Sequence, residues 1–288
     1  MHLSKRLRGL LFLLICFSFQ IAAGDAIQTN PSETEKTSIN AKKIINKYLT
    51  HAEYRFKTEL CYIMTRCGSD KGTNRHNYTS LYSKLFNSYV DKECNIFEMG
   101  LGSKNPDIPS NMGPSAVPGA SLFGWAIYFP KSQIYGADID SDILFTTPRI
   151  RTYYCDQRSA KSVQEMFEAD SLQNVFFDII IDDGLHEFPA NYNFLINGLN
   201  KLKKGGFFII EDLNEYTVAQ FKSEIPALKM QYNLSYIEVV KIPNKKTRMT
   251  MCFWLFRNNQ ILPLLLTVRS ISPLKRPGLR QAMRSKIG

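Results

Sequence analysis

From Asn95 onward, short apolar runs alternate with helical stretches. The apolar runs are NIFEMG, QIYGADID, RIRTYYCD, FFDIIIDD and GGFFIIEDL; LFGWAIYF, AKSVQEMFEA and ANYNFLINGLNKLKKG lie between them. Strands that alternate with helices predict a parallel, doubly wound α/β sheet with helices on both faces. Two further β-rich runs, LSYIEVVKI and TRMTMCFWLF, are separated by PNKK and predict a closing antiparallel hairpin.

Each of the five expected parallel strands ends in a carboxylate. The acids at these ends are Glu98, Asp138, Asp156, Asp182 with Asp183, and Glu211 with Asp212. The carboxyl ends of parallel strands form the ligand-binding edge of a doubly wound sheet. Carboxylates crowded on one edge repel each other. Any one of them could be a helix cap or a solvated turn residue, but the five strand ends together indicate a binding site.

The first strand ends in a glycine turn, Glu98-x-Gly100-x-Gly102. Asn105 stands where a dinucleotide fingerprint would have its third glycine, and no Gly-Lys-Ser/Thr follows, so a phosphate-cradling loop is unsupported. An acidic turn suits a cationic or hydroxyl-rich ligand. An acid after the second strand suits ribose hydroxyls, and one after the third suits the amine edge of a purine. These features together describe S-adenosylmethionine.

Length and composition indicate a globular protein. The chain has 288 residues, enough for one sizeable domain or at most two small ones, and 44% hydrophobic with 22% charged residues argues against disorder. The net charge of +10 is concentrated after Glu238, the last acidic residue. The basic C-terminal tail, 259–288, predicts an anionic partner such as a membrane surface, nucleic acid or acidic glycan; the alternative is a solubilising tail.

The N-terminus predicts a secretory leader at residues 1–24. Lys5, Arg6 and Arg8 precede an apolar run that ends in Ala22-Ala23-Gly24, as in a signal peptide. The run is short for a membrane span of about 20 residues, although an uncleaved signal anchor is the alternative. The localisation predicted is therefore the secretory pathway, secreted or membrane-anchored. The other expected segments are a polar linker at 25–40, a helical segment at 41–92 that contributes to the site, and the main domain at 93–258.

The remaining sequence signals are weaker. Five cysteines lie outside the leader without metal-like spacing, so neither a zinc site nor a dense disulfide framework is predicted. Cys94, Cys155 and Cys252 are expected to be buried. Asn77 and Asn233 begin formal glycosylation sequons. In the helical segment, Ile44, Ile45, Tyr48 and Leu49 are expected on one helix face.

Seven motifs in order give the chain a family resemblance. They are GSDKGTNRHNYTSLY, FEMGLG, GASLFGW, QIYGADID, RIRTYYCDQ, FDIIIDDGLHE and GGFFIIEDL. From about Gly68 to Asp212 the chain resembles the class I S-adenosylmethionine-dependent methyltransferases, and within them bacterial sugar O-methyltransferases that include macrolide enzymes. The resemblance implies a Rossmann-like sheet of seven strands, the last two being the hairpin.

The resemblance also implies residue roles. The cofactor would contact Glu98, Gly100, Gly102, Asp138, Asp156, Gln157, Lys71 and Tyr78, with Asp140 left as a surface acid. A divalent cation, usually Mg²⁺, would rest on Asp183, Glu211 and Asp212, since oxygen ligands suit a hard cation. His186 would act as general base beside Asp183 and take the proton of a sugar hydroxyl. The alternative for His186 is a capping role at a helix start.

Two features depart from the family pattern. The loop Ser103–Gly119 makes the path from the glycine turn to Asp138 about twice the usual ~20 residues, and it could be a lid, part of the acceptor site or packing. The leader is the second departure, because S-adenosylmethionine is made in the cytosol. The sequence therefore predicts a sugar or glycan O-methyltransferase. Its rivals are a methyltransferase of another small molecule or nucleic acid, and a secreted binding protein that keeps the fold; the charge asymmetry and the leader argue against nucleic acid. The oligomeric state is left open.

Overall fold

The computed structural model describes residues 33–50, 57–232, 234–242 and 250–257. Its helices are α2 (Glu33–Thr50), α3 (Glu59–Cys67), α4 (Tyr78–Leu85), α5 (Ala120–Tyr128), α6 (Ala160–Glu168), α7 (Phe188–Gly198) and α8 (Glu215–Tyr232). Its strands are β1 (Asn95–Met99), β2 (Gln133–Asp138), β3 (Ile150–Tyr154), β4 (Phe177–Asp182), β5 (Leu202–Leu213), β6 (Leu234–Ile242) and β7 (Thr250–Arg257). The leader and the basic tail lie outside the described residues, and so do the sequon residue Asn233 and the side chain of Cys252; the predictions made for them stay predictions.

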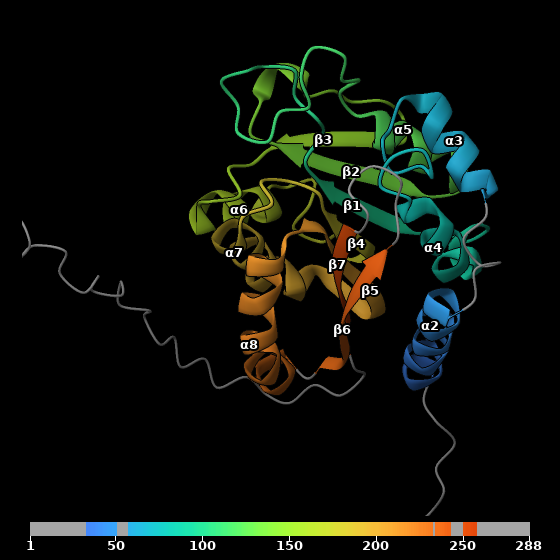
Figure 1. Ribbon diagram of the computed structural model, residues 1–288. Helices are drawn as coiled ribbons and strands as arrows, with labels where there is room; N and C mark the ends of the chain where they lie inside the picture. Colours follow the sequence, from blue (N-terminus) through green and yellow to red (C-terminus); the bar gives the residue numbers. More distant parts are fainter. Residues whose placement is uncertain (1–32, 51–56, 233, 243–249, 258–288) are drawn as a thin grey trace, which may run out of the picture.

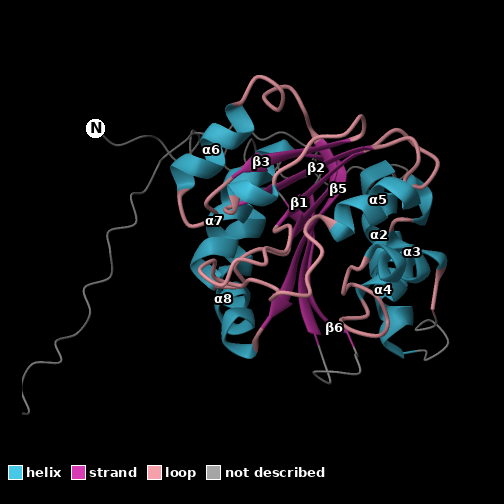
Figure 2. Ribbon diagram, turned by 90° about the horizontal axis from the view of Figure 1, so that it is seen from above, coloured by secondary structure: helices cyan, strands magenta, loops and turns pink. Residues whose placement is uncertain are grey.

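The sheet runs in the order β3-β2-β1-β4-β5-β7-β6. The pairs from β3 to β5 are parallel, whereas β7 pairs antiparallel with both β5 and β6. Figure 2 shows the sheet between two helical layers: α6, α7 and α8 cover one face, and α2, α3, α4 and α5 cover the other. Figure 1 shows the same strands and helices with the chain coloured from one end to the other. The predicted α/β fold with a mostly parallel sheet is confirmed.

The central strands are apolar along their whole length because both of their faces are buried. On β4, Ile179 and Ile181 pack into the cluster beneath α2 to α5, and Ile180 packs into the cluster beneath α6 to α8. All three side chains are fully buried. A strand covered on both faces reads as a continuous apolar run, which is the pattern in FDIIID.

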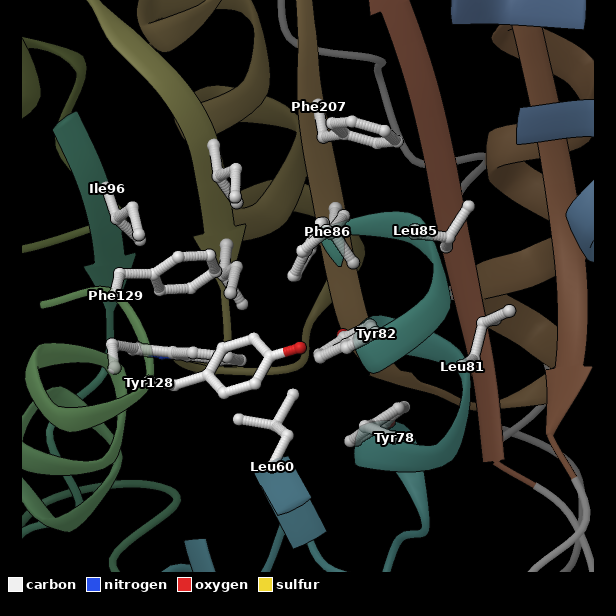
Figure 3. Close-up of a cluster of buried hydrophobic side chains, with 14 of the residues drawn as sticks. Leu60, Tyr78, Leu81, Tyr82, Leu85, Phe86, Ile96, Tyr128, Phe129 and Phe207 are labelled. Atoms are coloured by element: carbon white, nitrogen blue, oxygen red, sulfur yellow. The ribbon is translucent and has the colours of Figure 1, made fainter. Parts of the chain in front are cut away.

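Helix α4 fixes the N-terminal segment to the sheet through aromatic residues. Tyr78, Tyr82 and Phe86 follow one another at a spacing of four residues, and successive ring centroids lie 5.6 and 5.2 Å apart. Figure 3 shows these side chains packed among Leu60, Phe129 and other core residues. The three rings are fully buried. This packing sets the position of the tyrosine hydroxyls at the site described below.

The N-terminal part differs from the sequence prediction. Residues 33–40 belong to α2 and are not a linker, because the helix continues upstream from the apolar positions Ala41, Ile45 and Tyr48 that it buries. Leu49, expected on the same face, is exposed. The sequence pattern does not predict helix α8, which contains Pro226 and buries few apolar residues. Within the described part of the chain, no helix has the length and apolar character needed to cross a membrane.

Gly100, at the end of β1, lies against the backbone that follows β4, so its substitution should be costly. Its φ is +90°, and an added Cβ would lie 2.1 Å from the carbonyl oxygen of Asp183. We expect Gly100→Ala to lower the free energy of unfolding by about 2–5 kcal/mol, the sum of left-handed strain and overpacking. Gly113→Ala is the matched control, because Gly113 has φ +76° and open space around its Cβ position; it should lose about 1–2 kcal/mol. Equal losses in urea unfolding would contradict the steric argument.

Candidate active site

A pocket opens at the carboxyl ends of the parallel strands. Its walls come from the glycine turn, the ends of β2 to β5, residues 68–71 before α4 and the loop Ser103–Gly119. The cofactor residues predicted from sequence that line it are Glu98, Gly100, Gly102, Asp138, Asp156, Gln157 and Lys71. The strand-end acids therefore meet at one edge, as the alternating pattern indicated.

Asp138 holds the glycine turn while facing the pocket. Its two carboxylate oxygens accept the backbone N–H groups of Leu101 at 2.6 Å and Asp140 at 2.9 Å. Burial raises the pKa of Asp138. Each oxygen retains a lone pair for a ligand hydroxyl, so the position suits the ribose contact implied by the resemblance. Asp140, in contrast, is buried and accepts a hydrogen bond from Ser103, which corrects the expectation of a surface acid.

Asp156, the acid after β3, forms a salt bridge with a neighbouring side chain. Arg158 donates to both carboxylate oxygens of Asp156, at 2.9 and 3.0 Å, and lowers its pKa. Gln157 has a structural role, since its Nε2 donates to both oxygens of Asp182 at 2.7 Å and its Oε1 accepts the N–H of Leu185 at 2.9 Å. Gln157 thus clamps the turn after β4, and Asp156 is the better placed of the two for a purine amine.

Lys71 is a fully buried cation among three carboxylates. Its Nζ lies 2.6 Å from Asp183, 2.7 Å from Glu211 and 3.6 Å from Glu98. Burial opposes the ammonium charge, but these carboxylates outweigh it and raise the pKa of Lys71 well above its usual value. Lys71 therefore stays charged and offsets the repulsion between the acids.

Glu211 and Tyr78, predicted to contact the cation and the cofactor, are buried and are not among the residues that line the pocket. Glu211 is fully buried, with Lys71 on Oε2 and the hydroxyl of Tyr82 donating to Oε1 at 2.5 Å. Tyr78 is also fully buried and donates to Asp212 at 2.6 Å. Both carboxylate oxygens of Glu211 are thus bonded, one to Lys71 and one to Tyr82. Tyr78 contacts Asp212, whereas a contact with the cofactor was predicted for it.

Asp212 is held by side chains from the N-terminal segment. His76 Nδ1 lies 2.9 Å from its Oδ1, which also accepts the Tyr78 hydroxyl. Burial opposes ionisation of Asp212, but the hydrogen bond and charge of His76 outweigh it and lower its pKa to about 2. The same pairing raises the pKa of His76 against the effect of burial. His76 was not singled out from the sequence, where only its place in the GSDKG motif could have drawn attention to it.

Asp183, His186 and Asp212 form the candidate cation site. One ligand atom from each lies within 4.8 Å of the others, in the only such group found among the described residues. Nδ1 of His186 is buried without a hydrogen-bond partner in that part of the chain, and Nε2 lies 3.9 Å from Asp183 Oδ1. Two carboxylates beside an imidazole suit a divalent cation. His186 is not the capping residue of α7, whose N-cap is Glu187.

Sequence comparison finds sugar O-methyltransferases. No protein-family model matches the chain. It is 31% identical over 169 residues to 8-demethyl-8-alpha-L-rhamnosyl tetracenomycin-C 2'-O-methyltransferase of Streptomyces olivaceus, covering 59% of this chain and 41% of that protein. It is 30% identical over 158 residues to mycinamicin VI 2''-O-methyltransferase of Micromonospora griseorubida, covering 54% and 36%. The chain thus spans about two fifths of the length of these relatives.

Structure comparison finds methyltransferases with the same fold. The methyltransferase MycE, solved with Mg, S-adenosylhomocysteine and mycinamycin VI, matches with a TM-score of 0.55 at 20% identity, covering 80% of this chain and 65% of that one. A second MycE structure, with Mg and S-adenosylhomocysteine, gives 0.54 at 22% identity and covers 71% and 55%. The chain has the fold of the S-adenosylmethionine-dependent methyltransferases. Its resemblance to the sugar O-methyltransferases is confirmed.

Proposed function

We propose that the protein is an S-adenosylmethionine-dependent, divalent-cation-assisted O-methyltransferase that acts on a sugar or glycan hydroxyl. One observation carries the proposal: a single pocket joins the glycine turn and Asp138 to the group Asp183, His186 and Asp212. The relatives support it, because their names describe O-methyl transfer, in one case to a rhamnosyl compound, and MycE was solved with Mg and S-adenosylhomocysteine.

The donor half of the pocket would hold S-adenosylmethionine. The two N–H bonds that Asp138 accepts fix its carboxylate, so it can receive ribose hydroxyls without rearrangement. Glu98 is fixed by Ser121 and by Trp125 Nε1 at 2.5 Å, and its charge favours the cationic end of the donor. Because these groups are already fixed, binding costs less conformational entropy.

The acceptor half would activate a hydroxyl. Asp183 and Asp212 would hold the cation, which when bound lowers the pKa of a coordinated hydroxyl. His186 would take the hydroxyl proton, since it lines the same pocket and its Nε2 lies 3.9 Å from Asp183 Oδ1. The loop Ser103–Gly119 would cover the pocket from one side, because Ser110 donates to the carbonyl of Leu185, the residue before His186, at 2.9 Å.

The test is transfer of a radiolabelled methyl group from S-adenosylmethionine. p-Nitrophenyl α-L-rhamnoside and rhamnose-containing glycans are suitable acceptors, because one relative acts on a rhamnosyl compound. We expect labelled product that disappears with a chelator and returns with excess Mg²⁺. Donor binding without transfer to any sugar would favour the alternative, a binding protein with this fold.

We also propose that the leader directs the protein into the secretory pathway, with its site in a lumen that imports S-adenosylmethionine. The basic n-region and small residues near Gly24 support this. Mass spectrometry of natively expressed protein should find a chain that starts close to Asp25. An intact N-terminus in a membrane fraction would establish the signal-anchor alternative.

A further inference from the structure

The segment Gly68–Leu85 supplies a partner to each acid of the cation-site edge. Lys71 contacts Asp183 and Glu211, and Tyr82 also donates to Glu211. His76 and Tyr78 both contact Asp212. These partners lie more than 100 residues away in the sequence from the acids they hold. The segment therefore holds the acidic side chains at this edge in place, in addition to packing against the core.

The backbone of Asp212 has an unfavourable conformation that these partners help to stabilise. Its φ is +53°, in the left-handed region that non-glycine residues rarely adopt. The Tyr78 hydroxyl accepts the backbone N–H of Asp212 at 2.9 Å and donates to its Oδ1 at 2.6 Å. One tyrosine thus fixes both the backbone and the side chain of this residue.

The two carboxylate oxygens of Asp212 differ in their hydrogen bonds. Oδ1 is shared by the Tyr78 hydroxyl and His76 Nδ1. No hydrogen bond to Oδ2 is recorded among the described residues. With Oδ1 engaged, rotation of the carboxylate is restricted, and an oxygen remains for an ion beside Asp183 and His186. The far nitrogen of His76, Nε2, lies 3.7 Å from Asp70, so the imidazole is bracketed between two carboxylates.

We propose that His76 is a positioning residue of the cation site, which holds Asp212 so that its second oxygen faces the ion. The inference rests on the proposed function, because it assumes that Asp212 ligates a divalent cation. His76 does not itself touch the ion or the acceptor. Groups that hydrogen-bond a metal-ligating carboxylate typically contribute about 10- to 100-fold to metal affinity.

The test is the affinity for Mn²⁺, measured on the full chain from the electron paramagnetic resonance signal of free Mn²⁺. His76→Ala should weaken binding by about 10- to 100-fold. His76→Asn should stay within about threefold of wild type, because the asparagine amide nitrogen occupies nearly the place of Nδ1. His76→Gln places its amide near the Nε2 position and should resemble alanine. Arg75→Ala is the matched control, since Arg75 is the exposed neighbour.

The fold is monitored by urea unfolding and by S-adenosylhomocysteine affinity. The stability in urea and the S-adenosylhomocysteine affinity should change little in His76→Asn and His76→Gln. A loss of Mn²⁺ affinity in His76→Gln alone would then result from the position of its amide nitrogen relative to Asp212, and not from unfolding. Wild-type affinity in His76→Ala, with binding lost in Asp212→Asn, would overturn the positioning role and leave the proposed function standing. Equal losses in His76→Asn and His76→Gln would also overturn it. Absence of Mn²⁺ binding in the wild type would contradict the proposed function and this inference together.

Discussion

Replacing His186 with alanine is expected to reduce methyl transfer by about 10²–10⁴-fold, the usual contribution of a positioned general base. Cation and donor binding should be retained, because Asp183 and Asp212 would carry the ion and the donor would rest on the ends of β1 to β3. Residual activity should rise with pH, as solvent base replaces the imidazole. The measurement is the initial rate with a competent sugar acceptor between about pH 6 and 9.

Two further variants separate the possible roles of His186. His186→Asn keeps a polar side chain but is a poor base, so it should be as slow as alanine. Asp183→Asn keeps the shape of the acid and removes a ligand charge, so it should behave like chelation of the wild type. A fast His186→Asn enzyme would contradict the general-base role. Loss of Mn²⁺ from His186→Ala would instead make His186 a ligand.

Replacing Lys71 with methionine is expected to lower the free energy of unfolding by about 3–5 kcal/mol, because breaking a buried ion pair leaves uncompensated charge. Lys71 is 1% exposed and serves Asp183, Glu211 and Glu98 at once. Methionine has a similar length and fills the space, so the loss of unfolding free energy results mainly from removal of the ammonium charge. Urea unfolding monitored by tryptophan fluorescence measures it.

The control for Lys71 is Lys161→Met. Lys161 is exposed and pairs with Glu165 at 3.4 Å on the surface of α6, where such pairs contribute about 0–1 kcal/mol. A Lys71→Met protein as stable as this control would show that the acids do not need the buried ammonium. Recovery of part of the stability on combining Lys71→Met with Glu211→Gln would support the charge explanation, since the double variant also removes one of the carboxylate charges that the ammonium offsets.

The strands and their acidic ends could be predicted because they depend on local patterns. FDIIID is apolar on both faces, so its place inside a covered parallel sheet follows from the sequence. The convergence of Asp138, Asp183 and Asp212 then follows from strand polarity. Helix α8 gives no comparable pattern, since it contains Pro226 and buries few apolar residues.

The detailed contacts of the site could not be predicted, because they join distant segments. Glu211 and Asp212 are adjacent, yet one is saturated by Lys71 and Tyr82 while the other faces the pocket. Asp212 also has a left-handed backbone, which composition does not reveal. The pairing of His76 with Asp212 likewise depends on how the segment before α4 folds over the sheet edge.

We expect this pocket to bind S-adenosylmethionine beside a divalent cation. Isothermal titration calorimetry of the full chain with S-adenosylmethionine, with and without Mg²⁺, measures that binding. We expect saturable binding near one donor per chain. Asp138→Ala should weaken it by about 1.5–3 kcal/mol, the range for a lost charge-assisted hydrogen bond, and chelation should leave it largely intact. No donor binding in the wild type, or an unchanged affinity in Asp138→Ala, would contradict the account.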